Sequence, residues 1–202
     1  RKKIATLEPE QRNMIKVMEL NLDVEPRLAI PNRVIDDFLE KYRDNDALSS
    51  YQGTNGRSRF KRLKSHEQLR VMFQARAREF YDDVTVRDEP KPLQYFRQRL
   101  ASGLVGRHCG QCHGGKVEAK PFLLTKRANS EEVAYTNFYI LHMSEHADYR
   151  LIDRDRPEDS LLFQYALPRD EAKLPHPDVQ GFRSFYNGRS EERRVGKECA
   201  TG

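Results

Sequence analysis

Residues 107–115 read RHCGQCHGG and contain two of the chain's three cysteines. Cys109 and Cys112 are separated by two residues, and His113 follows directly. In a chain of this composition, C-x-x-C-H arises by chance about once in a thousand sequences, so coincidence explains it poorly. The pattern is typical of covalent haem attachment, in which two thiols add to the haem vinyl groups and the next histidine binds the iron. The sequence therefore predicts one haem c, bound through Cys109 and Cys112, with His113 as the proximal iron ligand.

Apolar residues recur at regular intervals on both sides of this motif. The stretch before it, LQYFRQRLASGLVGRHC at 93–109, predicts a helix with one buried face formed by Leu93, Phe96, Leu100 and Leu104. Residues 134–151 are apolar enough to be buried, but their pattern fits a helix or a strand. Residues 153–168, DRDRPEDSLLFQYALP, predict a turn followed by a short helix that Asp159 or Ser160 caps and Pro168 ends.

With CGQCHGG and the apolar helix before it, the downstream segment LIDRDRPEDSLLFQYALPRDEAKLPHPDV carries a resemblance to a known family. Residues 93–188 resemble the monohaem cytochrome c-like proteins abundant in planctomycetes. The resemblance implies a helical domain that transfers single electrons, with thioethers at Cys109 and Cys112 and His113 on the iron. It also implies a periplasmic or otherwise exported protein, because covalent haem attachment normally occurs outside the cytoplasm.

The sixth iron ligand is where the chain departs from this family. Many members have a Met beside a Pro in the late loop, whereas this chain has KLPHPDV, with His176 between two prolines. The prolines favour an extended, stiff loop, and we expect His176 to be the distal ligand. A second imidazole in place of a thioether lowers the reduction potential. His176 facing water is the alternative.

Other arrangements at the iron stay open at this stage. His142 and His146 are four residues apart, so they would share one face of a helix and either could compete as a ligand. Met143 offers a thioether. An open five-coordinate iron would admit small ligands or peroxide, which would make the protein a peroxidase or a ligand sensor.

Two alternative functions of this motif do not involve haem. Cys109, Cys112 and a neighbouring histidine could join His176 or His142 in a structural zinc site. The C-x-x-C pair alone could cycle as a dithiol, although no βαβ pattern surrounds it. We see no phosphate-binding loop, nucleophile elbow or distinct carboxylate pair, so an electron carrier is favoured over a hydrolase or transferase.

The predicted fold class is mainly α, with a helical N-terminal extension before a truncated cytochrome c-like domain. Residues 1–92 form the extension, and a Pro-containing linker at 87–92 precedes the domain at 93–188. Helices are expected after Pro9, after Pro31 and after Ser65, where Ser65 and Gln68 fit a capping box. His66 is expected at the surface. The apolar residues assigned to these three helices are Met14, Ile15, Met18, Leu20, Val34, Ile35, Phe38, Leu39, Tyr42, Leu69, Met72, Phe73, Phe80 and Tyr81.

The formal charge of +5 is small and spread along the chain, which argues against a nucleic-acid partner. The densest basic run, residues 56–66, is interpreted as a polar loop that leads into a helix. No apolar run is long enough for a membrane span or a signal peptide. Because the chain begins with Arg1, we expect an export signal upstream. The redox partner is not predicted.

Residues 189–202, RSEERRVGKECATG, lack apolar periodicity. Their first eleven residues match the in-frame translation of a common short-read sequencing adapter. We interpret this tail as artefactual and unstructured, which removes Cys199 from the chemistry and implies that a native C-terminal helix is missing.

Overall fold

The computed structural model describes residues 5–53, 55–114, 124–125 and 130–179, together with Phe182 and Ser184. Residues 8–90 form one compact unit, here called the N-terminal unit. Residues 5–7 and the described residues from Lys91 onward form a second, here called the C-terminal unit. The division after Pro90 falls within the Pro-containing stretch 87–92. The predicted artefactual tail lies outside the described residues.

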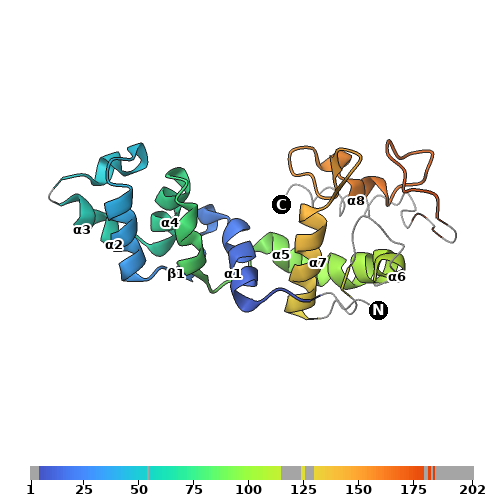
Figure 1. The fold of residues 1–202 in the computed structure, drawn as a ribbon, viewed down its shortest axis with the longest axis horizontal. Coiled ribbons are helices and arrows are strands. Elements are labelled where there is room, and N and C mark those ends of the chain that lie inside the picture. Colours follow the sequence, from blue (N-terminus) through green and yellow to red (C-terminus); the bar gives the residue numbers. More distant parts are fainter. Residues whose placement is uncertain are drawn as a thin grey trace. The chain divides into compact units, whose positions relative to one another are not determined.

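Both units are mainly helical, so the predicted mainly α class is confirmed. In the described part of the chain, no helix has the length and apolar character needed to cross a membrane. The N-terminal unit contains α1, η1, β1, α2, η2, α3, α4, η3 and β2 (Figure 1). Their bounds, in that order, are Pro9–Met18, Leu22–Val24, Leu28–Ala29, Asn32–Lys41, Asp46–Tyr51, Gly56–Lys61, Ser65–Gln74, Arg78–Asp83 and Thr85–Val86.

The core of the N-terminal unit is built around Phe38 of α2, which is fully buried. Its ring stacks on Tyr42 at 5.3 Å between centroids and lies 5.7 Å from Phe60 and 6.0 Å from Phe80. The predicted apolar face of α2 is therefore confirmed. β1 and β2 pair antiparallel, with Leu28 opposite Val86, and join the segment before α2 to the last residues of the unit.

Several details of this unit were predicted wrongly. α4 has no Ser65–Gln68 capping box: its N-cap is Lys64, whose amide donates to Glu67 at 2.8 Å. Gln68 is buried instead, and its side-chain Nε2 donates a hydrogen bond to the Phe60 carbonyl at 3.1 Å. His66, expected at the surface, is only 9% exposed because the helix begins at Ser65 and carries it inward.

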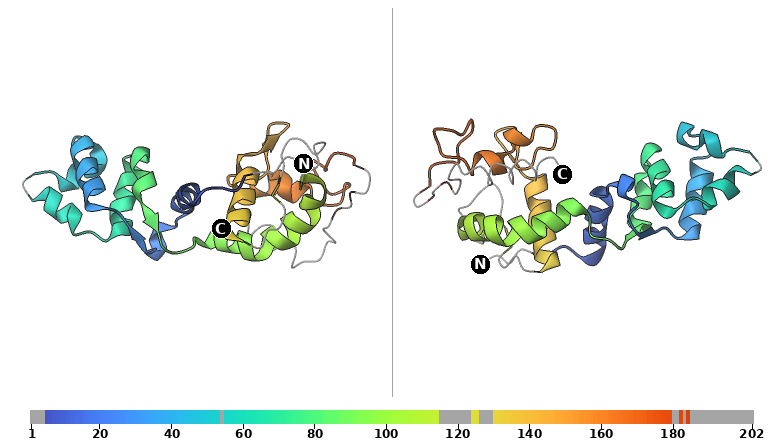
Figure 2. Two further views of the ribbon diagram at one scale, coloured as in Figure 1. Left: turned by 60° about the horizontal axis from the view of Figure 1, so that its bottom comes forward. Right: turned by 180° about the vertical axis from the view of Figure 1, so that it is seen from behind.

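The C-terminal unit begins with one continuous helical stretch from Lys91 to His113, made of α5, η4 and α6 (Figure 2). η4 is a π-helix, in which hydrogen bonds run from residue i to i+5. The remaining elements are α7, the hairpin strands β3 and β4, η5 and α8. In order, the bounds of all eight are Lys91–Tyr95, Phe96–Cys109, Gly110–His113, Glu131–Met143, Glu145–His146, Tyr149–Arg150, Pro157–Asp159 and Leu161–Gln164.

α7 crosses the long helical stretch, and Figure 1 shows the two elements against each other. The rings of Phe96 and Phe138 meet edge to face at this crossing, 5.3 Å apart. Ser130 caps α7 by accepting a hydrogen bond from the Val133 amide. The run at 134–151, which fitted either a helix or a strand, thus begins as a helix and ends as a hairpin.

Candidate functional site

The C-x-x-C-H motif lies at the end of the long helical stretch. Cys109 ends η4, and Cys112 and His113 belong to the last turn, α6. Neither thiol is in a disulfide, and both side chains are partly exposed. Burial raises the pKa of Cys109 to about 11, so this thiol is protonated at neutral pH. A redox-active dithiol uses a lowered pKa, which makes the dithiol reading the weaker one here.

The π-helical winding of η4 explains the glycine between the two cysteines. In a helix with i→i+5 bonds, Gly110 and not Cys109 lies above Val105, and the Gly110 amide donates to the Val105 carbonyl. A Cβ at Gly110 would lie 3.3 Å from that carbonyl oxygen. The same winding buries Val105 completely and leaves the predicted core residue Leu104 only half-buried, so the prediction for Leu104 was wrong.

A second segment of chain is fixed against the end of the motif. The Leu124 amide donates to the His113 carbonyl at 2.8 Å. The next residue, Thr125, is held by Asn137 of α7, which is fully buried. Asn137 Oδ1 accepts from the Thr125 amide at 2.8 Å and from its hydroxyl at 2.7 Å, and Asn137 Nδ2 donates to the Thr125 carbonyl at 3.2 Å. α7 thereby anchors residues 124 and 125 next to the backbone of His113.

The structure brings His113 and His176 together, although 63 positions separate them in the sequence. Their ring centroids are 6.4 Å apart, and the ring planes are nearly perpendicular at 78°. A metal–imidazole bond is about 2 Å long and the ring centre lies about 1 Å beyond the nitrogen, so two imidazoles on opposite sides of one metal have centres about 6 Å apart. The centroid separation is of this size, and the two rings meet in a T-shaped arrangement.

The environment of His176 leaves one ring nitrogen available. Nδ1 lies 2.9 Å from the Pro177 carbonyl oxygen, which can only accept, so Nδ1 carries the proton and Nε2 keeps its lone pair. A histidine that binds a metal is commonly oriented in this way by a backbone carbonyl. Burial lowers the pKa of His176, which favours the neutral form that can bind a metal. Phe182 stacks on the ring at 4.0 Å, and Tyr165 meets it edge to face at 4.9 Å.

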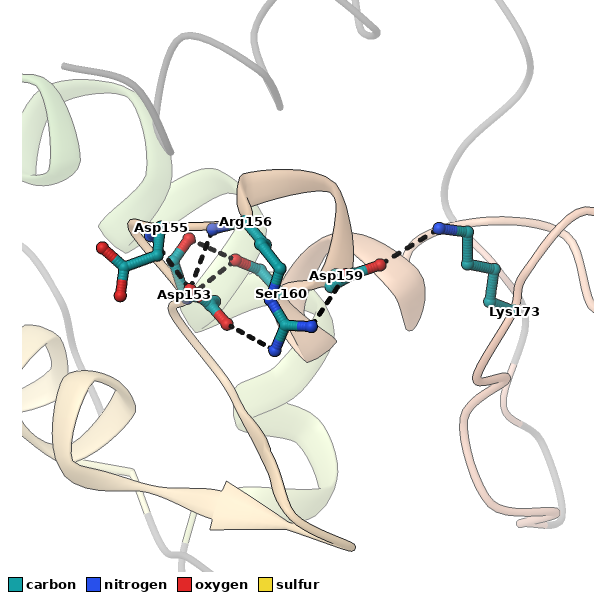
Figure 3. Close-up of polar contacts among 6 residues, drawn as sticks. All are labelled: Asp153, Asp155, Arg156, Asp159, Ser160 and Lys173. Carbon is teal, nitrogen blue, oxygen red and sulfur yellow. Dashed lines mark hydrogen bonds and ion pairs between the residues drawn. The ribbon is translucent and has the colours of Figure 1, made fainter.

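The loop that carries His176 is tied to the turn before α8. In that turn the Asp153 carboxylate accepts hydrogen bonds from the amides of Asp155 and Arg156, both at 3.0 Å (Figure 3). The buried Ser160 hydroxyl accepts from the Asp153 amide at 2.8 Å and donates to its carbonyl at 3.1 Å. Asp159 extends the network to the loop, since Lys173 Nζ lies 3.1 Å from its carboxylate (Figure 3).

The competing ligands do not form the pair that the sequence predicted. α7 ends at Met143, so His142 and His146 do not share a helix face, and that prediction was wrong. His142 lies in the last turn and stacks on Phe138 with parallel rings 6.0 Å apart. His146 is exposed in β3, and Met143 is 62% exposed.

The basic run at 56–66 belongs largely to α3 and is matched by acidic side chains. Arg57 lies 3.0 Å from Glu40, and Lys61 lies 2.6 Å from Asp36. The predicted loop at these residues is instead the short helix Gly56–Lys61. Its cations therefore form surface ion pairs within the unit.

Sequence reasoning missed the residues that support the site, namely Asn137, Gln164 and Asp153. Asn137 and Gln164 are polar residues inside otherwise apolar runs, and this was the available signal, because a buried amide needs partners. Among the described residues, no group of three or more His, Cys, Asp or Glu side chains could hold a metal ion by itself. No protein family model, curated protein or solved structure matches the chain.

Proposed function

We propose that the C-terminal unit is a monohaem c-type cytochrome and that the protein carries single electrons. The observation that carries this proposal is the pairing of His113 with His176 next to Cys109 and Cys112. Two thiols for covalent attachment lie within one helical turn of one imidazole, and the ring centroid of a second imidazole lies 6.4 Å from that of the first. When bound, the haem supplies the one-electron redox chemistry.

Each of these four residues has a separate role in the proposal. Cys109 and Cys112 would form the thioethers that attach the haem. His113 and His176 would bind the iron. Two imidazoles give a lower potential than an imidazole with a methionine, so we expect a low-potential carrier.

A structural zinc site is the alternative that uses the same residues. A closed zinc site needs four tetrahedral ligands, and Cys109, Cys112, His113 and His176 could supply them only if all four converged. The 6.4 Å between the ring centroids is longer than the about 5 Å expected of two imidazoles that bind one tetrahedral ion. We further propose an exported location, because covalent haem attachment normally takes place outside the cytoplasm.

The test is co-expression of the chain, targeted to the periplasm, with a haem-attachment system. We expect one covalently bound haem per chain by mass spectrometry and a low-spin visible spectrum. His176→Ala should keep the covalent haem and convert the spectrum to high spin, whereas the exposed His146→Ala should change neither. Stoichiometric zinc without haem bands would overturn the proposal in favour of the zinc module. A low-spin spectrum in His176→Ala would remove His176 from the iron.

A further inference from the structure

Gln164 connects α8 to the loop that presents His176. It is the last residue of α8, and its side chain is buried, with 3% of its surface exposed. Oε1 accepts from the Lys173 amide at 2.7 Å and from the Leu174 amide at 3.4 Å. Nε2 donates to the Glu158 carbonyl at 2.5 Å. One side chain therefore joins the turn before α8 to the loop two residues ahead of His176.

We propose that Gln164 is the positioning residue for His176, holding its imidazole close to that of His113 before any iron is bound. This inference rests on the proposed function, because iron is the group that the two rings would share. Gln164 itself does not touch the iron site: it acts through the backbone of residues 173–174.

The chemistry of the glutamine suits this task better than that of other buried residues. Only a primary amide offers an acceptor with two lone pairs and two donor hydrogens in one plane. The acceptor takes two successive loop amides, and the donor fixes the other end to Glu158. Buried backbone groups that lose such partners cost free energy, so the loop is held in one conformation.

Downstream of these two amides, other contacts orient His176 itself. Arg169 Nη1 donates to the His176 carbonyl at 3.1 Å, and the Tyr165 ring packs edge to face against the imidazole. These two contacts restrict His176 itself. Gln164 differs from Arg169 and Tyr165 because its buried side chain joins the loop at residues 173–174 to the turn before α8. Without it, the fraction of molecules with His176 facing His113 falls, and the apparent strength of the iron–His176 bond falls by the same factor.

The experiment measures how well added imidazole competes with His176 in the haem-loaded protein. Imidazole binds ferric iron only when His176 has left, so its apparent affinity reports the strength of the internal ligand. We expect Gln164→Leu to bind imidazole at least about tenfold more tightly than wild type, and His176→Ala to bind it more tightly still. Gln164→Glu keeps the acceptor for both loop amides, so it should behave more like wild type than Gln164→Leu does.

Ser160→Ala is the matched control. Ser160 is equally buried, lies in the same turn and forms two hydrogen bonds, but it does not contact the loop at 173–174. We expect this variant to lose stability while its imidazole affinity stays within about twofold of wild type. If Ser160→Ala and Gln164→Leu raise the imidazole affinity equally, Gln164 is only a structural residue and the positioning role is overturned.

A measurement that needs no haem keeps the inference separate from the proposed function. In the haem-free protein, amide hydrogen exchange at Lys173 and Leu174 should be fast in Gln164→Leu and slow in wild type and Ser160→Ala. Retained protection in α7 shows that Gln164→Leu still folds. If the wild type binds haem but Gln164→Leu has the same imidazole affinity and the same amide exchange as the wild type, only the positioning role is overturned. If the wild type attaches no haem, the proposed function is overturned, and the positioning role with it.

Discussion

Replacing Asn137 by alanine should destabilise the C-terminal unit by about 2–6 kcal/mol. The buried amide of Asn137 satisfies the amide, hydroxyl and carbonyl of Thr125. The hydroxyl can rotate toward another partner, but the two backbone groups cannot. Each buried group left unpaired costs about 1–3 kcal/mol, and two such groups give the range stated. That loss is a large part of the 5–15 kcal/mol typical of a whole domain.

The two units can unfold separately, so the assay must resolve them. Hydrogen exchange by mass spectrometry in increasing urea gives a free energy for peptides of each unit, and peptides from residues 8–90 serve as an internal reference. Ser144→Ala is the control variant, because the Ser144 hydroxyl donates to the Ile140 carbonyl one turn earlier in α7, and losing this bond should cost at most about 1 kcal/mol. A loss below about 1 kcal/mol in Asn137→Ala, with the Thr125 amide still protected, would refute the reasoning.

Three further predictions concern both units. Phe38→Ala should destabilise the N-terminal unit by about 3–5 kcal/mol in the same exchange assay, since the ring is fully buried, and leave haem attachment unchanged. Gly56→Ala should destabilise that unit by at least about 1–3 kcal/mol, because a Cβ there would clash with the backbone oxygen of Tyr51; a neutral result in urea unfolding would contradict this contact. Hydrogen bonds from the Arg156 and Asp155 amides lower the pKa of Asp153, so the native state binds fewer protons than the unfolded state and stability falls as the pH drops through 3.8 and below. The free energy of unfolding of Asp153→Asn should therefore fall less than that of wild type between pH 7 and pH 3. An equal fall in both proteins would count against the hydrogen bonds from the Asp155 and Arg156 amides to the Asp153 carboxylate.

The sequence predicted secondary structure well where one apolar face packs on one core. In α2 the four buried residues recur at helical spacing, and the expected face is the observed one. In η4 the same reasoning failed at Leu104, because residue spacing on a π-helix differs from that on an α-helix. The buried residue Val105 follows from i→i+5 hydrogen bonding, which apolar periodicity in the sequence does not specify.

Short sequence motifs identified the candidate site residues, but they did not identify the buried side chains that hold the neighbouring backbone in place. His176 between two prolines could be identified from the sequence, and the structure places its ring centroid 6.4 Å from that of His113. The His142 and His146 pair was predicted from spacing alone and failed, since the helix ends between them. Asn137 and Gln164 act on residues 12 and 9 positions away through backbone atoms, and sequence spacing carries no information about such contacts.

The bond from the Leu7 amide to Thr136 Oγ1 links residues 129 positions apart and belongs to the C-terminal unit. Residues 8–90 are thus an insertion within the chain of that unit, entered and left through two covalent connections. During synthesis this insertion emerges first and can fold as a unit. Once folded, it replaces a long flexible segment, and the entropy lost on closing a loop grows with the logarithm of its flexible length. The N-terminal unit, once folded, therefore lowers the entropic cost of bringing residues 5–7 to α7.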